Sequence, residues 1–465
     1  MMASSQEECG KLVAEKRIQW VDCQFLDMDG RLKTLTLPGY EFAEGSVWKH
    51  GVAFDGAAVR GMTTPKHSDM FAFPDPSTFI YMQGRDHASI LCDIRTVDGE
   101  PSSMDSRGLA RRATERSVAE GFPECWMFAE LEFFLFESAA QAIEENAAFN
   151  RDMPYGPGSY RQMEKPGSHD RPGKGYLASP PHDKFESVRS ELSSVLQGLG
   201  YLIRYHHHEC GARQLEIEYR ALPNAVLASD AVVRYKQLAR EISSKQGLVP
   251  TFMPKPVFAD AGSGMHVQQY LAREGKSLFH DPDDKHRLSQ AARYYIGGIL
   301  EHAPYMAAIT NPTVNSYKRL VPEFEAPIFA AWSPMNRTAL VRIPAAGMSG
   351  TSEVEVRHPD STSNPYLTHG LLLWCGLDGI KRKLDPGDPI NENIHRIPKE
   401  RRKQMGIKGL PLTLGDAVEA MLSDDVLKEA LGPDLFGAFY EEKRKEWRMY
   451  CAHVSEWEHY HYFDA

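Results

Sequence analysis

The chain has 465 residues, 42% of them hydrophobic, and a formal net charge of −10 at pH 7. This length exceeds one ordinary core and favours two domains. The chain has no long basic run for nucleic acid and no apolar run of about 20 residues for a membrane span. Its seven cysteines form no Cys-x-x-Cys pair and its polar N-terminus lacks a signal sequence, which predicts a reduced, cytoplasmic protein.

The first hundred residues predict a small β-rich unit. Residues 18–38 form two strand-like runs around Asp29-Gly30, a good signal for a hairpin. Another strand-like run covers 87–101, and 102–120 have helical composition after cap-type residues. We therefore expect one domain over residues 8–105 and a second over 106–465.

The remainder of the chain mixes helices and strands irregularly, which predicts an α+β fold rather than a doubly wound parallel sheet. Helices are expected at 183–200, 226–247, 284–309 and 364–385, and strands at 126–136, 201–219, 251–270 and 336–344. Residues 141–175 predict a long exposed loop. The tail, 443–463, predicts a helix with an aromatic end that packs on the body or on a neighbouring subunit. No GxGxxG or Walker motif is present.

Two glutamates interrupt the apolar run "MFAELEFFLF". Glu130 and Glu132 are two residues apart, so in a strand their carboxylates point to the same face. Two like charges on such a strand repel each other and are costly to desolvate. This pattern raises the question of what stabilises them.

Three further segments carry comparable side chains. "HHHECGARQLEIEYR" contains Glu209 and Glu216, which could face each other across a hairpin. His266 follows the Gly-rich turn "AGSGMH", and Glu355 shares a strand face with Arg357 in "SEVEVRHPD". Carboxylates without paired cysteines favour Mg²⁺ or Mn²⁺, and two such ions in one cluster are common in phosphoryl transfer.

Each of these residues also has an ordinary structural interpretation. A single strand glutamate is more often exposed at an edge than a ligand, and 206–208 could be a solvated turn, so we assign no metal role to His206 or His207. The coincidence of four segments favours a site. Four arginines offer planar, bidentate groups for phosphate and carboxylate: Arg319, Arg337, Arg342 and Arg357.

These segments closely resemble the glutamine synthetase family, in the class that includes bacterial and archaeal enzymes. The matching stretches include "FDGAAVRGM", "FAELEFFLF", "HHECGARQLEI", "FMPKP", "GSGMH", "NPTVNSYKRLVPEFEAP", "NRTALVRIP" and "EVEVRHPDSTSNPYL". The resemblance spans roughly residues 15–460. It implies an N-terminal β-grasp-like domain and a catalytic domain with a curved antiparallel sheet flanked by helices. It also implies a dodecamer of two hexameric rings, with active sites between neighbouring subunits.

The resemblance further implies roles for individual residues. Two or three Mg²⁺ or Mn²⁺ ions per site would have as ligands Glu132, Glu209 and Glu216 on the glutamate side and Glu130, His266 and Glu355 on the phosphate side. L-glutamate would contact Gly262, Arg319 and Arg357, and ATP phosphates would contact Arg337 and Arg342. The catalytic residues would be Asp55 from the neighbouring subunit, Glu325 on a flap, and Arg337. The amine pocket would comprise Asp55, Ala58, Tyr176 and Glu209.

The implied activity is ATP-dependent phosphorylation of the γ-carboxylate of glutamate, followed by attack of an amine on γ-glutamyl phosphate. This chain has Ala58 in "DGAA" where ammonia-using members commonly have serine in "DGSS". Its tail also resembles members that use alkylamines. The expected product is therefore a γ-glutamylamide of a primary alkyl- or arylamine, with glutamine formation from ammonia as the alternative. Other departures from the family pattern are Ala221, Gln268, Tyr270, Glu323 and Glu353.

Two other classes of function are disfavoured. An inactive structural or regulatory relative should have lost metal ligands, yet all six candidate ligands and all four arginines are present. A guanidino kinase would share the phosphoryl chemistry but would not need the matching glutamate-binding segments. The identity of the amine and the choice between Mg²⁺ and Mn²⁺ stay open at this point.

Overall fold

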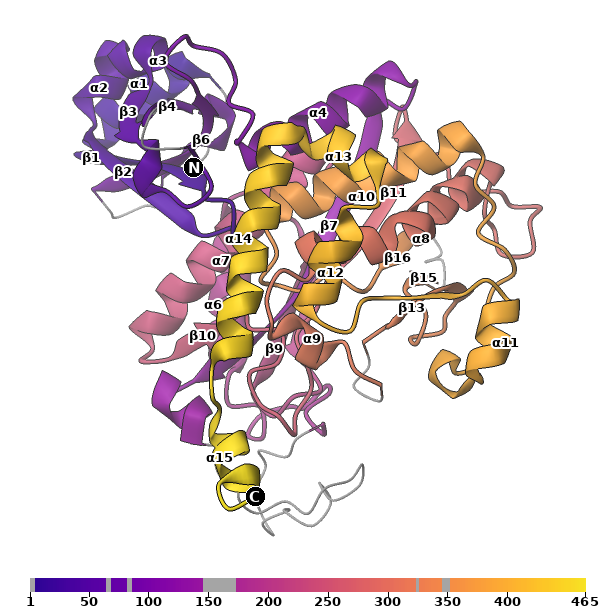
Figure 1. The fold of residues 1–465 in the computed structure, drawn as a ribbon. Helices are drawn as coiled ribbons and strands as arrows, with labels where there is room; N and C mark the ends of the chain where they lie inside the picture. The colour runs from indigo at the N-terminus through magenta and orange to yellow at the C-terminus, as the bar shows by residue number, and fades with distance from the viewer. Residues whose placement is uncertain (1–4, 64–67, 82–85, 145–172, 323–325, 345–351) are drawn as a thin grey trace.

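Two β-sheets organise the chain, one in an N-terminal unit and one in a larger C-terminal unit (Figure 1). The computed structural model describes residues 5–63, 68–81, 86–144, 173–322, 326–344 and 352–465. Helices pack on both sheets, and the predicted α+β class is confirmed. None of the helices in these ranges is long and apolar enough to cross a membrane.

The N-terminal sheet has the strand order β2-β1-β6-β4-β3, with β5 paired to β6. Its strands are β1 Trp20–Leu26, β2 Leu32–Pro38, β3 Val52–Asp55, β4 Asp69–Pro74, β5 Ile80–Tyr81 and β6 His87–Arg95. Strand β1 runs antiparallel to β2 and parallel to β6. The helices α1 Gln6–Lys16, α2 Tyr40–Glu44 and α3 Ser46–His50 complete the unit. The β-grasp-like fold expected for this unit is confirmed.

The predicted hairpin at Asp29-Gly30 joins β1 and β2. Gly30 has φ +77°, and a Cβ on it would lie 2.9 Å from the Cα of Asn364. The side-chain amide of Asn364 donates a hydrogen bond to the carbonyl of Asp27 at 3.1 Å. Glycine is therefore required at this turn both for its backbone conformation and because the turn packs directly against the C-terminal unit.

The C-terminal sheet has the order β14-β15-β16-β11-β7-β9-β8, with β10 on β7 and β12 on β11. The strands are β7 Glu124–Phe136, β8 Ile203–His208, β9 Gln214–Tyr219, β10 Val249–Thr251, β11 Met265–Arg273, β12 Lys276–Ser277, β14 Trp332–Pro334, β15 Val341–Ile343 and β16 Val354–Val356. Its pairs are antiparallel except β14–β15, which is parallel. Strands β13 Phe329–Ala330 and β17 Lys408–Gly409 form a separate pair.

Most predicted elements are present, with shifted bounds. The helices are α4 Ser106–Ala119, α6 Glu186–Gly198, α7 Ala225–Lys245, α8 Gln290–Thr310, α9 Ser316–Arg319, α10 Pro365–Arg382, α11 Lys399–Gln404, α12 Leu414–Met421, α13 Asp425–Leu431, α14 Pro433–Ala452 and α15 Glu456–Tyr462. Helix α8 begins at 290 rather than 284 because the Asp284 carboxylate accepts backbone hydrogen bonds in a preceding turn and Ser289 caps the helix.

Two predicted segments differ from the structure. The strand expected over 251–270 is divided into β10 and β11, because the intervening Pro- and Gly-rich segment leaves the sheet and forms a loop. In the loop expected over 141–175, residues 141–144 are helical, and 145–172 lie outside the described residues.

Strand β7 separates the core from the polar face of the sheet. Leu131, Phe133 and Leu135 are fully buried on one face and belong to a cluster with Leu192 of α6 and Tyr235 of α7. The alternating side chains of β7 therefore point to the opposite face. The helices behind the sheet fix the position of the glutamates in front of it.

Candidate active site

Strand register brings the predicted polar residues into one row on the face of the C-terminal sheet. The directly opposed pairs, from β8 to β15, are His207–Glu216, Glu216–Glu132, Glu130–His266, Gln268–Glu355 and Glu355–Arg342. Residues opposed across neighbouring strands project from the same face. We call six of the side chains on this face the carboxylate face: Glu130, Glu132, Glu216, Glu218, His266 and Glu355. His207 lies beside them at the β8 end of the row.

Glu130, His266 and Glu355 form the first group that could hold a cation. One ligand atom from each lies within 4.8 Å of the other two. Nδ1 of His266 is 3.2 Å from Oε2 of Glu130. The side-chain amide of Gln268 donates to Oε1 of Glu130 at 2.8 Å, so this departure from the family pattern orients a candidate ligand. These three residues are the ones that the sequence placed together on the phosphate side.

His207, Glu209 and Glu216 form a second group with the same spacing. In the hairpin His207, not Glu209, is opposite Glu216, so the expectation that the two glutamates face each other across the strands is wrong. Strand β8 ends at His208, which leaves Glu209 in the turn. His207, to which the sequence assigned no metal role, therefore lies with its Nε2 3.9 Å from Oε2 of Glu216.

Glu132, expected in that second group, is held differently. Its Oε2 accepts hydrogen bonds from the backbone N–H of Gly264 at 2.7 Å and from the side-chain amide of Gln214 at 2.9 Å. Its Oε1 lies 3.9 Å from Nδ1 of His266. Glu132 thus lies between the two groups with one oxygen fixed by the protein.

Glu218 is a residue that the sequence interpretation missed. It forms a third group with Glu130 and Glu216, again with ligand atoms within 4.8 Å. The signal was present, because Gln214, Glu216 and Glu218 alternate along β9 just as Glu130 and Glu132 do along β7.

The electrostatics of the carboxylate face favour cations. Burial raises the pKa of Glu132 and Glu355, and burial together with neighbouring carboxylates raises the pKa of Glu216 and brings that of Glu218 to about 8. Burial and the nearby Arg357 guanidinium lower the pKa of His266 to about 3, which leaves its imidazole neutral and able to donate a lone pair. Clustered carboxylates with one neutral imidazole fit hard divalent cations.

Three of the candidate arginines border this face. Nε of Arg342 is 2.5 Å from one oxygen of Glu355, and Nε of Arg357 is 3.1 Å from the other. Arg319 donates to the backbone carbonyls of Arg357 at 3.0 Å and His358 at 2.8 Å. These contacts fix the guanidinium groups beside the carboxylates.

A small cavity joins the residues expected to bind glutamate. Glu132, Glu209, Gly262, His266, Arg319 and Arg357 are among the residues that line it. A Cβ on Gly262 would lie 2.7 Å from Cγ of Arg319 and 2.9 Å from the carbonyl oxygen of Pro254. Only glycine allows this close approach.

The residues expected around the amine are placed in two locations. The ring of Tyr176 lies 5.4 Å from that of His207, and the Arg337 guanidinium lies 5.9 Å from the Tyr176 ring. Asp55 ends the edge strand β3 of the N-terminal unit and accepts a hydrogen bond from the backbone N–H of Ala57. Figure 1 shows this strand apart from β9.

Within the described parts of one chain, no contact joins Asp55 or Ala58 to the carboxylate face, so their expected contribution to a neighbouring subunit's site stays a prediction. The predicted flap residue Glu325 and the departure Glu323 lie outside the described residues.

Comparisons with known proteins agree with this geometry. The β-grasp domain of glutamine synthetase matches residues 17–97, and the glutamine synthetase catalytic domain matches residues 103–462. Glutamine synthetase from Archaeoglobus fulgidus is 40% identical, over 98% of this chain and 97% of its own length. Glutamine synthetase from Methanosarcina mazei is 37% identical, over 98% and 97%.

Solved structures give the same result at the level of the fold. A GmaS–ADP complex superposes with a TM-score of 0.84 at 26% identity, covering 99% of this chain and 100% of its own. Glutamine synthetase from Plasmodium falciparum gives a TM-score of 0.84 at 23% identity, over 99% of both chains. Both domain models match, and the glutamine synthetase from Archaeoglobus fulgidus is 40% identical over 98% of this chain, in agreement with the register of the carboxylate face. We conclude that this chain belongs to the glutamine synthetase family of ATP-dependent glutamate ligases.

Proposed function

We propose that this chain converts L-glutamate and ammonia to L-glutamine with ATP. The observation that carries the proposal is the carboxylate face bordered by Arg319, Arg342 and Arg357 in a chain 40% identical to a glutamine synthetase over nearly its whole length. This reverses the order of acceptors expected from the sequence, because the relatives compared above by sequence are named glutamine synthetases.

In this proposal the carboxylate face holds the divalent cations. The ligands on the phosphate side are Glu130, His266 and Glu355. The ligands on the glutamate side are Glu132, Glu209 and Glu216. The cations neutralise charge on the transferred phosphoryl group when they are bound. Mg²⁺ and Mn²⁺ both suit this donor set. The solved GmaS complex with ADP supports a nucleotide site on this fold.

The remaining residues act on the substrates. Gly262, Arg319 and Arg357 bind glutamate, and Arg337 and Arg342 bind the phosphates of ATP. The γ-carboxylate attacks the terminal phosphorus of ATP, which releases ADP and makes a phosphate the leaving group. The amine nitrogen, after losing a proton to an acidic group for which Asp55 is the candidate, then displaces inorganic phosphate. Glu325 closes a flap that excludes water from the acyl phosphate.

A γ-glutamylamide synthetase is the second candidate, because Ala58 offers no hydroxyl where ammonia-using members commonly have serine. Ammonium binds best in a pocket that offers a full set of polar groups. A less polar pocket favours an amine that carries an alkyl substituent. Asp55, Tyr176 and Glu209 would form the rest of this pocket in either case.

We also propose the dodecamer of two hexameric rings, with each active site completed by Asp55 of a neighbouring subunit. Exposed apolar side chains on the tail support an assembly role: Met449, Val454, Trp457, Tyr462 and Phe463. Light scattering should give a mass of twelve chains, and a stable monomer with full activity would contradict the shared site.

The identity of the acceptor is tested by incubating the protein with glutamate, Mg-ATP and either ammonium or one of a panel of primary alkyl- and arylamines. The product is then identified by mass spectrometry. We expect glutamine, with phosphate release that depends on ammonium. The Ala58→Ser variant should raise kcat/KM for ammonium relative to alkylamines by about tenfold. A wild-type preference for an alkylamine would overturn the main proposal in favour of the second candidate.

A further inference from the structure

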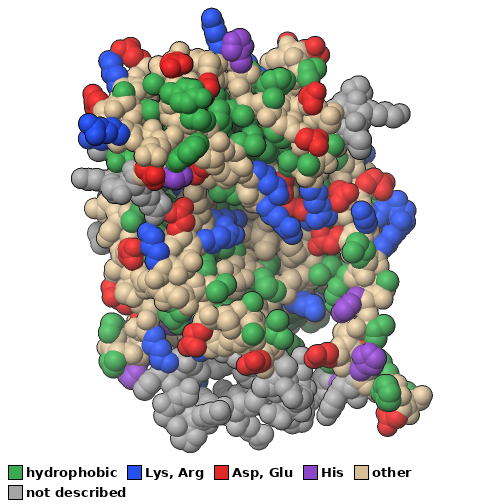
Figure 2. Space-filling model, turned by 90° about the vertical axis from the view of Figure 1, so that its left-hand side faces the viewer, with side chains coloured by type: hydrophobic (Ala, Val, Ile, Leu, Met, Phe, Trp, Pro, Cys, Tyr) green, Lys and Arg blue, Asp and Glu red, His purple; other side chains and the backbone are tan. Residues whose placement is uncertain are grey.

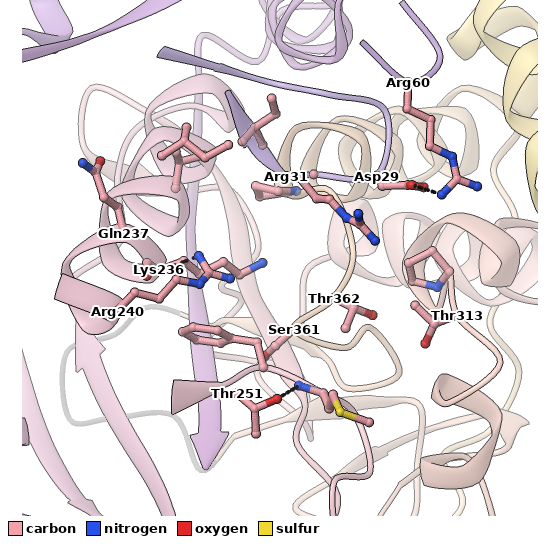
Figure 3. Close-up of a pocket in the computed structure, with 18 of the residues that line it drawn as sticks. Asp29, Arg31, Arg60, Lys236, Gln237, Arg240, Thr251, Thr313, Ser361 and Thr362 are labelled. Atoms are coloured by element: carbon pink, nitrogen blue, oxygen red, sulfur yellow. Dashed lines mark hydrogen bonds and ion pairs between the residues drawn. The ribbon is translucent and has the colours of Figure 1, made fainter. Parts of the chain in front are cut away.

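A second cavity, of about 1110 Å³, lies where the N-terminal unit meets the C-terminal unit (Figure 3). Its walls come from the β1–β2 hairpin, α7, α14 and the segments 250–253, 312–313 and 361–362. The carboxylate face contributes none of the residues that line it. Figure 2 shows Lys and Arg side chains gathered around the hollow between the two units.

Two cations of α7 lie side by side in this cavity, as Figure 3 shows. Lys236 is only 7% exposed, and in the described structure its ammonium makes no hydrogen bond or ion pair. It lies 5.8 Å from the centre of the Phe252 ring, and the Arg240 guanidinium lies 5.1 Å from the same ring. Burial, and then the charge of Arg240, lower the pKa of Lys236 to about 7. A buried ammonium beside a second cation is costly unless an anion accompanies it.

The acidic residues of the hairpin and α14 do not compensate these cations, because they pair with other partners. Asp29 pairs with Arg60 at 2.7 Å and with Lys443 at 2.8 Å. Glu442 also pairs with Arg60, and Glu446 with Lys443, both at 3.0 Å. One further carboxylate lines the cavity, that of Glu241 on α7, which accepts a hydrogen bond from the side-chain amide of Gln237 at 3.1 Å. The remaining positive side chains outnumber it: Arg31, Lys236, Arg240 and Lys445.

We propose that this cavity is a binding site for a small organic anion, whose carboxylate or phosphate group lies against Lys236 and Arg240. Arg31 faces the same space from the hairpin (Figure 3). Thr251 accepts a hydrogen bond from the backbone N–H of Met253 through Oγ1 and keeps its own O–H for donation to the anion. Leu26, Phe252 and Met449 add apolar wall, so the site suits an anion with a carbon skeleton.

The site is tested on the full-length, metal-free protein with two probes, pyrophosphate for the phosphate group and citrate for the carboxylate group. Isothermal titration calorimetry measures binding, at an ionic strength matched with NaCl. Lys236→Met keeps the buried aliphatic stem and removes the charge, and Arg240→Gln removes the second cation. Lys245→Met, in the exposed last turn of the same helix, is the matched control. Arg342→Gln reports binding at the candidate active site instead.

We expect at least one probe to bind, and both cavity variants to weaken its binding by about tenfold or more. Lys245→Met should bind as the wild type does, and Arg342→Gln should keep the binding that Lys236→Met and Arg240→Gln weaken, whatever the outcome of the acceptor assay. Three results would overturn the proposal: neither probe binds, Lys236→Met and Arg240→Gln bind normally, or Arg342→Gln alone abolishes binding. If light scattering showed that Lys236→Met separates the subunits, the cavity would be a subunit contact, which also contradicts an anion site.

Discussion

At the scale of single residues, Glu130 and Glu132 show how alternation along one strand produces a site. Their two-residue spacing predicted a shared face, and the structure brings both onto it. Glu130 belongs to two of the three groups that could hold a cation, whereas Glu132 is fixed by Gly264 and Gln214. The repulsion expected between them is relieved on one side by protein hydrogen bonds and, in our account, on the other by cations.

The spacing of residues could not give every member of the carboxylate face. Pairing across a hairpin depends on where the turn ends, and a shift of one residue exchanges the two faces. The sequence therefore suggested Glu209 opposite Glu216, where the structure has His207. Glu218, by contrast, follows the same alternation as Glu216 and could have been predicted.

The Glu130→Ala variant should lose ATP turnover by a factor on the order of 10³, because it removes a ligand from two candidate cation groups. Its Mn²⁺ affinity, measured by electron paramagnetic resonance, should fall in parallel. Glu124→Ala is the matched control on the same face of β7, since Glu124 bonds only the Trp126 indole and the Gly275 backbone in the described structure. Equal activity of the two variants would refute the metal assignment.

Stability should depend on pH through His369, which is fully buried. Burial and the charge of Lys236 lower its pKa from 6.5 to about 3 in the folded chain. Above pH 6.5 the ring is neutral in both the folded and the unfolded states. As the pH falls from 6.5 towards 3 only the unfolded chain binds the proton, so the free energy of unfolding falls by about 1.4 kcal/mol per pH unit for this group.

The His369→Asn variant keeps a polar group near Ser229, which contacts Nδ1 of His369 at 2.9 Å, and removes the titration. Urea unfolding between pH 7 and pH 4 should show a shallower loss of stability for the variant. Parallel pH profiles would show that His369 is protonated in the folded chain. The pKa values of His266 and His358 are also lowered to about 3, so these residues affect the pH profiles of the wild type and the variant alike. The contribution of His369 is therefore the difference between the two profiles.

At the scale of elements, helix α4 links the two units through charge. Arg107 is buried and contacts Asp75 and Asp93 of the N-terminal unit at 2.7 and 2.6 Å, and Asp230 of α7 at 2.9 Å. The sequence predicted this helix but not the burial of Arg107, since residue type alone does not show which side chain is buried. The long helices and β7 were predictable because their patterns extend over many residues, while the divided 251–270 segment was not.

Replacing Arg107 by methionine should lower the free energy of unfolding by about 3–5 kcal/mol, because it leaves the buried carboxylate of Asp230 without its cation. Arg111→Met is a close control: Arg111 also contacts Asp93, one helical turn away, but its side chain is 43% exposed. The Arg111→Met substitution should lower the free energy of unfolding by less than about 1 kcal/mol. Urea denaturation followed by tryptophan fluorescence compares them, and similar midpoints would contradict the role of burial.

At the scale of the whole molecule, the chain consists of a β-grasp unit packed on a catalytic unit, as its two matched domains indicate. The long ordered motifs made the family and the fold class predictable. They could not reveal the cavity between the units, since its walls come from segments more than 400 residues apart in sequence, such as Asp29 and Lys443. They also could not fix the acceptor, because in our proposal its pocket draws on a neighbouring subunit.

The central claim is that the γ-carboxylate of glutamate is activated as an acyl phosphate, whichever amine follows. Glutamate labelled with ¹⁸O in its γ-carboxylate, incubated with the enzyme, Mg-ATP and ammonium, tests this claim through mass spectrometry of the released phosphate. Our account predicts one ¹⁸O atom in each phosphate, because the carboxylate oxygen that attacks phosphorus leaves with it. Unlabelled phosphate accompanying a labelled amide product would contradict the account.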